Sequence, residues 1–361
     1  MLTSNNITIV APGRICLFGD HQDYLELPVI ACAIDRQVIL SAKINHDDCF
    51  HILMPNIKSE RHIPISETFD ILKPQDYFAS TLRVVKRYGC IPNKGYTINL
   101  ESNIPINAGI SSSSAIVVAW VFFLLKAFGC IKKIFPQLIA QIAYEAEVLE
   151  HNSPGGKMDQ FTIAIGNIIY IDTAQDLVYN TIGTSMEGLI LAESGISKET
   201  LGLLSSIKSK ATKAIDCVSK NVSNFNLKAT TMDDYKIFSK YISQDLEPYF
   251  YAAIINHTIT NKALTLFKDG NIDVEKVGKL MNEHHDILKN KLNITVPKID
   301  NMIDTALKAG AYGAKIVGSG GGGCIVVLSP TEKKEEIINA LLKSGAKNAY
   351  EVSISQGAYC K

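Results

Sequence analysis

The sequence lacks the features that mark several special classes of protein. Its 36 basic and 36 acidic residues give a formal net charge of zero, so the basic surface typical of nucleic-acid-binding proteins is missing. None of its eight cysteines belongs to a CxxC pair or stands beside histidines at zinc-ligand spacing. Scattered cysteines in a chain of 361 residues favour reduced thiols over a disulfide framework. We therefore expect neither a nucleic-acid partner nor a disulfide-stapled fold.

Long apolar segments are also missing. The apolar run Ala115–Leu125 stops at Lys126, whereas a helix that spans a bilayer needs about 20 apolar residues. The N-terminus, MLTSNNITIV, has no basic stretch followed by an apolar one and so does not resemble a secretory signal. We therefore expect a cytoplasmic protein with no membrane partner, and a buried core helix at Ala115–Leu125.

Length and composition predict a globular chain of two domains. Hydrophobic residues make up 47% and charged residues 20%, which is enough for a large core. Single cores rarely grow beyond about 250–300 residues. Periodicity is weak between Asp172 and Glu187, which predicts domains at 1–175 and 176–361. Because helical and strand patterns interleave, we expect the α+β class.

Glycine, proline and periodicity predict several elements. Strands are expected at Ile7–Val10 and Ile15–Phe18, separated by a turn at Pro12-Gly13. An apolar helix should end at Gly129, since glycine is favoured just beyond a helix, and Pro136 should begin the next helix. Further expected elements are the strands Val29–Ser41, Tyr96–Leu100, Tyr312–Val317 and Cys324–Leu328 and the helix Pro297–Leu307.

The segment Gly109–Ala115, Gly-Ile-Ser-Ser-Ser-Ser-Ala, comes directly before that apolar helix. A helix N-terminus has unpaired backbone N–H groups and a partial positive charge, glycine lets a phosphate approach, and serines add hydroxyl donors. Helix capping by serine is the alternative, but capping needs one serine and this segment has four. The segment therefore predicts a phosphate-binding loop.

A second glycine-rich segment, Gly318–Gly323, contains a GxGxxG pattern. A dinucleotide fingerprint would open a helix, but a strand is expected at Cys324–Leu328, which disfavours an NAD-dependent oxidoreductase. No Lys-Ser or Lys-Thr pair follows to complete a Walker A loop. A flexible hairpin stays open, although so many glycines cost conformational entropy and indicate close approach to a ligand or to another backbone.

A third stretch places Arg14, Asp20, His21 and Asp23 around one turn between expected strands. Carboxylates beside a histidine are suitable ligands for hydroxyl groups and are candidate acid–base groups. A solvated polar loop is the alternative for this stretch taken alone.

Together these stretches resemble the motifs of the galactokinase, homoserine kinase, mevalonate kinase and phosphomevalonate kinase (GHMP) superfamily. Ala11–Tyr24 resembles the galactokinase signature, Pro105–Ala115 the phosphate loop, and Gly310–Cys324 the third motif. Gly156–Phe161 resembles a galactokinase GxMDQF segment and Met281–His285 a galactokinase helix. The resemblance, closest to galactokinase-like sugar kinases, implies a ribosomal S5 domain 2-like N-terminal domain and a ferredoxin-like C-terminal domain.

The resemblance also implies an enzyme that transfers the γ-phosphoryl group of ATP to a sugar hydroxyl, with Mg²⁺ as cofactor. Asp159 would face the acceptor hydroxyl as a base or electrostatic anchor, and Arg14 would stabilise its charge. Ser113 and Glu147 would bind Mg²⁺. By position, the sugar would be held by Asp20, His21, Asp23 and Gly156, and the ATP phosphates by Gly109, Ile110, Ser111, Ser112, Ser113 and Ser114.

Departures from the galactokinase pattern leave the acceptor open. Asp20 stands where galactokinases usually carry glutamate, Leu25-Glu26-Leu27 replaces Asn-Gly-Gly, and Ala192–Thr200 lacks the usual tyrosine and arginine. Lys157 would suit a uronic acid or would point to solvent. We expect the anomeric O1 of galactose, or of a related hexose or uronic acid, as acceptor. The alternatives are a mevalonate-type alcohol kinase and a catalytically silent sugar and ATP sensor. The oligomeric state and the adenine-binding residues stay unassigned.

Overall fold

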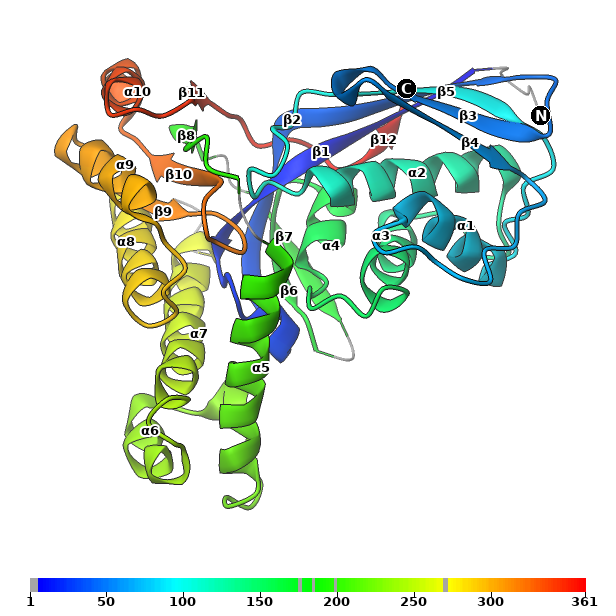
Figure 1. Cartoon of the computed structure of the whole chain (residues 1–361). Coiled ribbons are helices and arrows are strands. Elements are labelled where there is room, and N and C mark those ends of the chain that lie inside the picture. Colours follow the sequence, from blue (N-terminus) through cyan, green and yellow to red (C-terminus); the bar gives the residue numbers. More distant parts are fainter. Residues whose placement is uncertain (1–5, 175–176, 184–185, 198–199, 269–271) are drawn as a thin grey trace.

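The computed structural model describes residues 6–174, 177–183, 186–197, 200–268 and 272–361. These residues form two β-sheets with helices packed against them, which is the predicted α+β class (Figure 1). The larger sheet has the strand order β12-β1-β2-β5-β3-β4, and β6 pairs with β2 and with β7. Its strands are β1 (Asn6–Phe18), β2 (Val29–Ile44), β3 (Cys49–Met54), β4 (Ser59–Pro64), β5 (Tyr96–Ser102), β6 (Ile168–Asp172), β7 (Val178–Ile182) and β12 (Tyr359–Cys360).

The smaller sheet has the order β11-β8-β10-β9 and lies on the other side of the molecule. Its strands are β8 (Leu189–Glu193), β9 (Gly313–Ile316), β10 (Cys324–Leu328) and β11 (Asn348–Glu351). The helices of this half are α5 (Thr200–Ser219), α6 (Met232–Phe238), α7 (Glu247–Lys268), α8 (Val274–Asn290), α9 (Pro297–Lys308) and α10 (Lys334–Lys343). Of the helices between β8 and β9, α5, α6 and α7 extend away from the sheets, whereas α8 and α9 pack against the smaller sheet (Figure 1).

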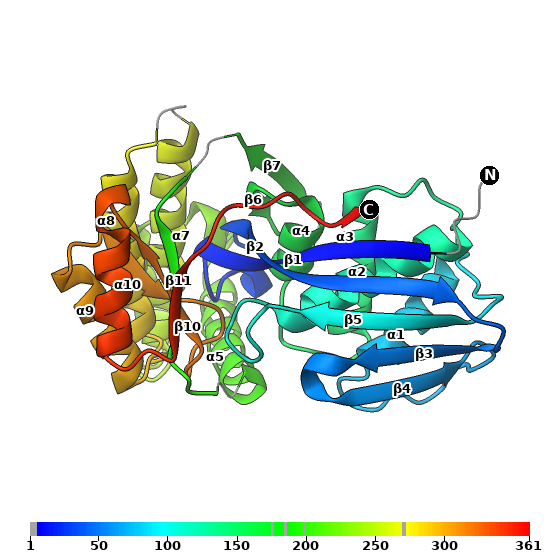
Figure 2. The ribbon, with the colours of Figure 1, turned by 90° about the horizontal axis from the view of Figure 1, so that it is seen from above.

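Four helices lie on one side of the larger sheet, whose other face is turned toward the viewer in Figure 2. They are α1 (Tyr77–Arg87), α2 (Ser112–Phe128), α3 (Pro136–Tyr144) and α4 (Met158–Ile165). Of these, α2 and α4 contact the strands, and α1 and α3 pack on those two helices. The predicted core helix is confirmed in α2: Trp120 is fully buried, with its ring centroid 5.2 Å from that of Phe50 on β3. The helix ends at Gly129, as predicted, and this glycine has a positive φ of 73°. None of the helices in the described residues is long and apolar enough to cross a membrane.

The turn predicted at Pro12-Gly13 is wrong. Both residues lie inside one continuous strand, β1, whose pairing with β2 shifts register between them. A shift of this kind tolerates proline because proline cannot donate to the ladder. A side chain at position 13 would lie 3.2 Å from the carbonyl oxygen of Ile110, so glycine brings β1 close to residues 109–114, the serine loop that precedes and begins α2. The other predicted strands and helices named above are confirmed, with ends that move by a few residues.

The chain crosses between the two sheets more than once. β7 pairs with β6 in the larger sheet, although it follows residue 175. At the other end, β12 returns from the smaller sheet to pair with β1. We propose on this pairing that the first domain extends to Ile182 and includes the last residues of the chain. Residues 175 and 176 themselves lie outside the described residues.

Candidate active site

One cleft of about 710 Å³ between the two halves gathers the motifs. Its lining includes every predicted site residue except Ile110: Arg14, Asp20, His21, Asp23, Gly109, Ser111, Ser112, Ser113, Ser114, Glu147, Gly156 and Asp159. Ile110 is fully buried, so its side chain contributes to the core rather than to a ligand site. Residues more than 140 positions apart therefore meet at one place, as the resemblance implied.

Arg14 and Asp159 form a bidentate ion pair at the centre of the cleft. The Nε and Nη2 of Arg14 donate to the two carboxylate oxygens of Asp159 at 2.7 and 2.8 Å. The Arg14 Nη1 donates to the carbonyl oxygen of Gly109 at 2.6 Å, which ties the pair to the serine loop. Burial would lower the pKa of Arg14, but the Asp159 charge outweighs it and the pKa is raised. The arginine stays positive, and the aspartate, 26% exposed, faces the cleft.

The serine loop presents an uncapped helix N-terminus beside this pair. Ser111 has a left-handed backbone (φ 58°) at the N-cap of α2, yet its side chain makes no capping hydrogen bond. Its hydroxyl instead donates to Asp159 at 2.5 Å. The first N–H groups of α2 thus keep free hydrogen-bonding capacity toward the cleft, where a helix N-terminus favours anions. Helix capping, the alternative explanation for the serines, therefore does not apply to Ser111.

Glu147 lies on a one-turn π-helix, Glu145–Leu149, that follows α3. Such insertions are rare and occur frequently at functional sites, because they turn one side chain off the regular helical face. Glu147 accepts a 2.7 Å hydrogen bond from Gln160 on α4. Burial raises the pKa of Glu147 most strongly, hydrogen bonds from Gln160, Ser114 and Ser113 lower it, and the Asp159 charge raises it further. Carboxylate and hydroxyl oxygens close together are the ligands that Mg²⁺ prefers.

Asp23 and Gly156 are in contact within the lining of the cleft. A Cβ on Gly156 would lie 2.2 Å from a carboxylate oxygen of Asp23, so only glycine leaves that carboxylate in place. Burial, and after it the charge of Asp159, raises the pKa of Asp23 to about 6. His21 lies next to it, with its ring nitrogens 3.1 Å from the Ser319 carbonyl and from the Tyr24 hydroxyl. These polar groups converge on one part of the cleft.

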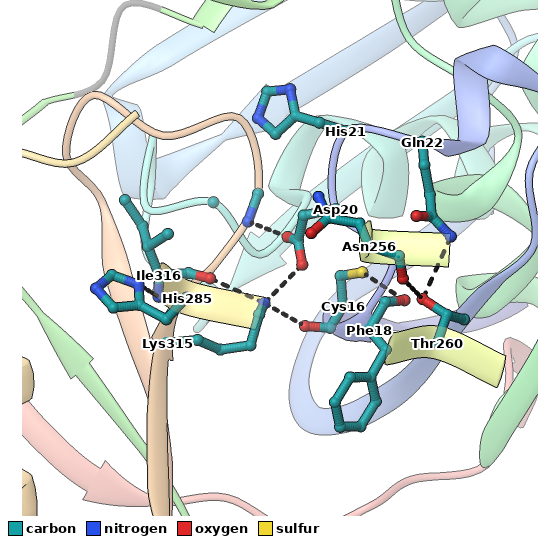
Figure 3. A network of polar contacts seen from close by, with 12 residues as sticks. Cys16, Phe18, Asp20, His21, Gln22, Asn256, Thr260, His285, Lys315 and Ile316 are labelled. Atoms are coloured by element: carbon teal, nitrogen blue, oxygen red, sulfur yellow. Dashed lines mark hydrogen bonds and ion pairs between the residues drawn. The ribbon is translucent and has the colours of Figure 1, made fainter. Parts of the chain in front are cut away.

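Asp20 differs from the other predicted ligands because its carboxylate is already bound within the protein (Figure 3). One oxygen lies 2.6 Å from the Nζ of Lys315, and the other accepts the backbone N–H of Gly318 at 3.1 Å. The two side chains are 1% and 0% exposed. Burial opposes ionisation of Asp20, but Lys315 outweighs it and the pKa is lowered. This pair links the turn that follows β1 to β9 across the two halves, and no sequence pattern predicted it.

The second glycine-rich segment is the hairpin loop between β9 and β10, and it packs on the serine loop. A Cβ on Gly318 (φ 79°) would lie 2.9 Å from the Gly109 carbonyl oxygen, and one on Gly323 (φ 81°) 2.8 Å from that of Ala108. Both positions need glycine for backbone conformation as well as for space. The loop therefore supports the serine loop, and its flexibility alone does not explain the glycines.

His284 and Lys157 lie outside the cleft lining. His284 is fully buried and stacks on Phe18, and burial, with Lys315 next, lowers its pKa to about 3, so it stays neutral. The Nζ of Lys157 lies 3.4 Å from the Ala174 carbonyl and 5.9 Å from the centroid of the Tyr144 ring. Lys157 thus contacts neither Asp159 nor the cleft, which weakens the argument for an acidic acceptor.

Sequence reasoning missed an apolar end of the cleft. Ile57 and Ile106 line it and are 53% and 60% exposed, and exposed apolar side chains in a cleft are typical of small-molecule sites. An adjoining cavity of about 350 Å³ continues from Met54 and Tyr77 toward Trp120. Exposed apolar residues in loops have no periodicity, so no sequence pattern pointed to them.

Solved structures with the same fold include kinases. The chain aligns with galactokinase from Lactococcus lactis, solved with galactose, with a TM-score of 0.89 at 20% identity over 99% of this chain and 95% of that one. It aligns with mevalonate kinase from Methanococcus jannaschii with a TM-score of 0.72 at 22% identity over 98% and 100%. These similarities place the chain in the two-domain GHMP kinase fold that the resemblance implied.

Family comparisons agree with the fold. Residues 76–167 match the GHMP kinases N terminal domain, residues 263–347 the GHMP kinases C terminal region, and residues 3–44 the galactokinase galactose-binding signature. Galactokinase from Thermotoga maritima is 29% identical over 93% of this chain and 94% of its own. Mevalonate kinase from Thermococcus sibiricus is 25% identical over 93% and 92%. The chain belongs to the GHMP kinase family and is a galactokinase-like phosphotransferase.

Proposed function

We propose that the enzyme transfers the γ-phosphoryl group of ATP to the anomeric hydroxyl, O1, of galactose or a closely related hexose. The observation that carries the proposal is the Arg14–Asp159 pair, held in a cleft beside the uncapped N-terminus of α2. Phosphoryl transfer asks a protein mainly for positioning and for charge neutralisation. A carboxylate fixed by arginine and a helix N-terminus supply both.

Asp159 would act on the acceptor hydroxyl, and Arg14 on the transferring phosphoryl group. The acceptor oxygen forms the new bond to phosphorus while the bond between phosphorus and the ADP oxygen breaks. Asp159 lies where it would take the proton of the hydroxyl or hold it electrostatically. Arg14, which contacts both Asp159 and the Gly109 carbonyl, would stabilise the charge of the transferring group. Gly109 and Ser111–Ser114 would surround the phosphates at the N-terminus of α2.

Ser113 and Glu147 would hold the Mg²⁺ that neutralises the phosphates. Glu147 is buried, and Ser113 is exposed at the start of α2 within hydrogen-bonding reach of it. This all-oxygen pair fits a hard cation, which also neutralises the charge of a buried carboxylate. The adenine would occupy the apolar end, where Ile57 and Ile106 are exposed. Eight free thiols support a cytoplasmic location.

The sugar would lie against Asp23, His21 and Gly156. Asp23 and His21 provide polar atoms for hydroxyl groups, and Gly156 holds the Asp23 carboxylate in position. The galactose-binding signature over residues 3–44 supports galactose as the first candidate. The buried Asp20 would shape this wall through Gly318 rather than reach the sugar.

A coupled ADP-release assay with Mg-ATP tests the proposal across galactose, other hexoses, uronic acids and mevalonate. We expect galactose or one related hexose to stimulate ADP release. A response to mevalonate alone would assign the enzyme to the alcohol kinases. ATP binding without any response would assign it to the silent sensors and would contradict the proposal.

A further inference from the structure

The hairpin formed by β3 and β4 carries a cluster of metal-binding side chains, Cys49, His51 and His62, outside the lining of the cleft. Phe50 and Ile52 are fully buried toward the helices, and side chains alternate along a strand, so Cys49 and His51 face the other side of the sheet. His62 on β4 pairs directly with His51 in the strand register. The two imidazole rings have centroids 4.4 Å apart.

One thiol and two imidazoles therefore converge at one point. A ligand atom from each of Cys49, His51 and His62 lies within 4.8 Å of the others. In a tetrahedral zinc site with Zn–S of about 2.3 Å and Zn–N of about 2.0 Å, one sulfur and two nitrogen ligand atoms lie roughly 3.3–3.6 Å apart. Side-chain rotations that move the ligand atoms by about an ångström would bring them to these separations. The open face of the sheet leaves room for such rotations.

A carboxylate completes the set. Asp47, 63% exposed, lies with one oxygen 3.5 Å from the Nε2 of His51. In metal sites an aspartate in this position either binds the ion itself or accepts the second N–H of the histidine, which fixes the ring. Cys49 is a free, partly exposed thiol, so it is available to a metal ion.

We propose that Cys49, His51 and His62 bind a zinc ion, with Asp47 as the fourth ligand or as the acceptor for His51. Thiolate and imidazole donors select zinc over magnesium, which prefers oxygen. The site is thus chemically separate from the Ser113–Glu147 pair. It escaped the sequence analysis because strand pairing, rather than a spacing motif, brings residue 62 to residues 49 and 51.

The ion would clamp the outer edge of the larger sheet. Among the described strands, β4 pairs only with β3, so it is one of the free edges of this sheet. The connection between the two strands, Pro55–Ile57, places Asn56 and Ile57 in the lining of the cleft. A ligand that binds only the folded state stabilises it. Zinc should therefore stabilise this hairpin and, through it, the apolar end of the cleft.

Cobalt titration of the full-length, reduced, metal-free enzyme tests the site. Co²⁺ replaces Zn²⁺ and gives a near-ultraviolet charge-transfer band when a thiolate binds it. We expect one equivalent of Co²⁺ to produce the band, Zn²⁺ to abolish it, and Cys49→Ser to lack it. Cys217→Ser, which removes another partly exposed thiol, should keep the band. Equal spectra for wild type and Cys49→Ser would overturn the proposal.

Thermal unfolding with and without zinc gives an independent measurement that needs no cysteine variant. At free zinc about 100-fold above Kd, the folded-to-unfolded ratio should rise about 100-fold. His62→Ala, at an exposed position, should unfold at the wild-type temperature without zinc and lose this increase. A zinc-dependent increase that is the same in His62→Ala and wild type would contradict the assignment.

Discussion

Two acid–base pairs anchored on the same stretch of chain have opposite surroundings. Arg14 with Asp159 and Asp20 with Lys315 are both close ion pairs, at 2.7 and 2.6 Å. Asp159 is 26% exposed and faces the cleft, whereas Asp20 and Lys315 are sealed from solvent. The two ion pairs therefore differ in role: the first is open to a substrate, whereas the second is buried and holds the turn after β1 against β9.

The largest effect should come from opening the first pair. Asp159→Asn removes the carboxylate that would take or hold the acceptor proton, so kcat should fall by ~10²–10⁴-fold. ATP binding should be retained, because the serine loop and α2 are unchanged. Single-turnover kinetics measure the rate of phosphoryl transfer, and nucleotide titration measures the affinity for ATP.

Asp172 offers a matched control. Its carboxylate pairs with Lys228 at 2.6 Å, is 30% exposed and lies outside the cleft lining. Asp172→Asn should keep wild-type turnover. Near-wild-type turnover in Asp159→Asn would remove Asp159 from the mechanism.

Breaking the second pair should affect stability more than chemistry. Lys315→Met leaves Asp20 buried without its cation, and removing one partner of a buried pair costs ~3–5 kcal/mol of unfolding free energy. Denaturant titration measures the loss, and the double variant Lys315→Met/Asp20→Leu should recover much of it. Lys279→Met, which removes a partner from an exposed pair with Glu275, should cost no more than ~1 kcal/mol. A loss in Lys315→Met as small as in Lys279→Met would show that the pair is not structural.

Crowding Asp23 should alter sugar binding selectively. The Cβ of Gly156→Ala would meet the Asp23 carboxylate at 2.2 Å, and such overpacking typically costs ~1–3 kcal/mol. KM for the sugar should rise accordingly while KM for ATP changes little. Gly155→Ala is the control, since its Cβ would meet only Val148 at 3.7 Å. Equal effects of the two variants would contradict the contact.

The pH dependence should report Asp23. Its pKa is raised to about 6, so the carboxylate becomes protonated as the pH falls through that value and then no longer accepts two hydroxyl hydrogen bonds. We expect kcat/KM for the sugar to decrease below about pH 6 and this decrease to be absent in Asp23→Asn. Asp159→Asn should shift the decrease to lower pH, because the Asp159 charge contributes to the raised pKa. If kcat/KM decreases below pH 6 in Asp23→Asn as it does in wild type, a group other than Asp23 is responsible for the decrease.

Local patterns predicted much of this molecule. The apolar run and Gly129 predicted α2 and its end, and the ordered motifs predicted which distant residues share the cleft. What they did not predict depends on contacts between distant segments. Lys315 meets Asp20 across 295 positions, and His62 meets His51 through strand register. Periodicity describes one element at a time, so it contains no information on such pairs.

The Pro12-Gly13 turn failed for a related reason. Proline and glycine usually signal a turn, but here strand β1 continues through them because β2 and the serine loop pack on both sides. Tertiary packing outweighed the local preference.

Phosphorus-31 NMR of the full-length enzyme with ATP, Mg²⁺ and galactose tests the central claim most directly. The account predicts a new phosphomonoester signal, coupled to the anomeric proton, that grows in step with ADP in wild type and is lost in Asp159→Asn. ATP that binds without any new phosphomonoester, with galactose or the other hexoses, would contradict it.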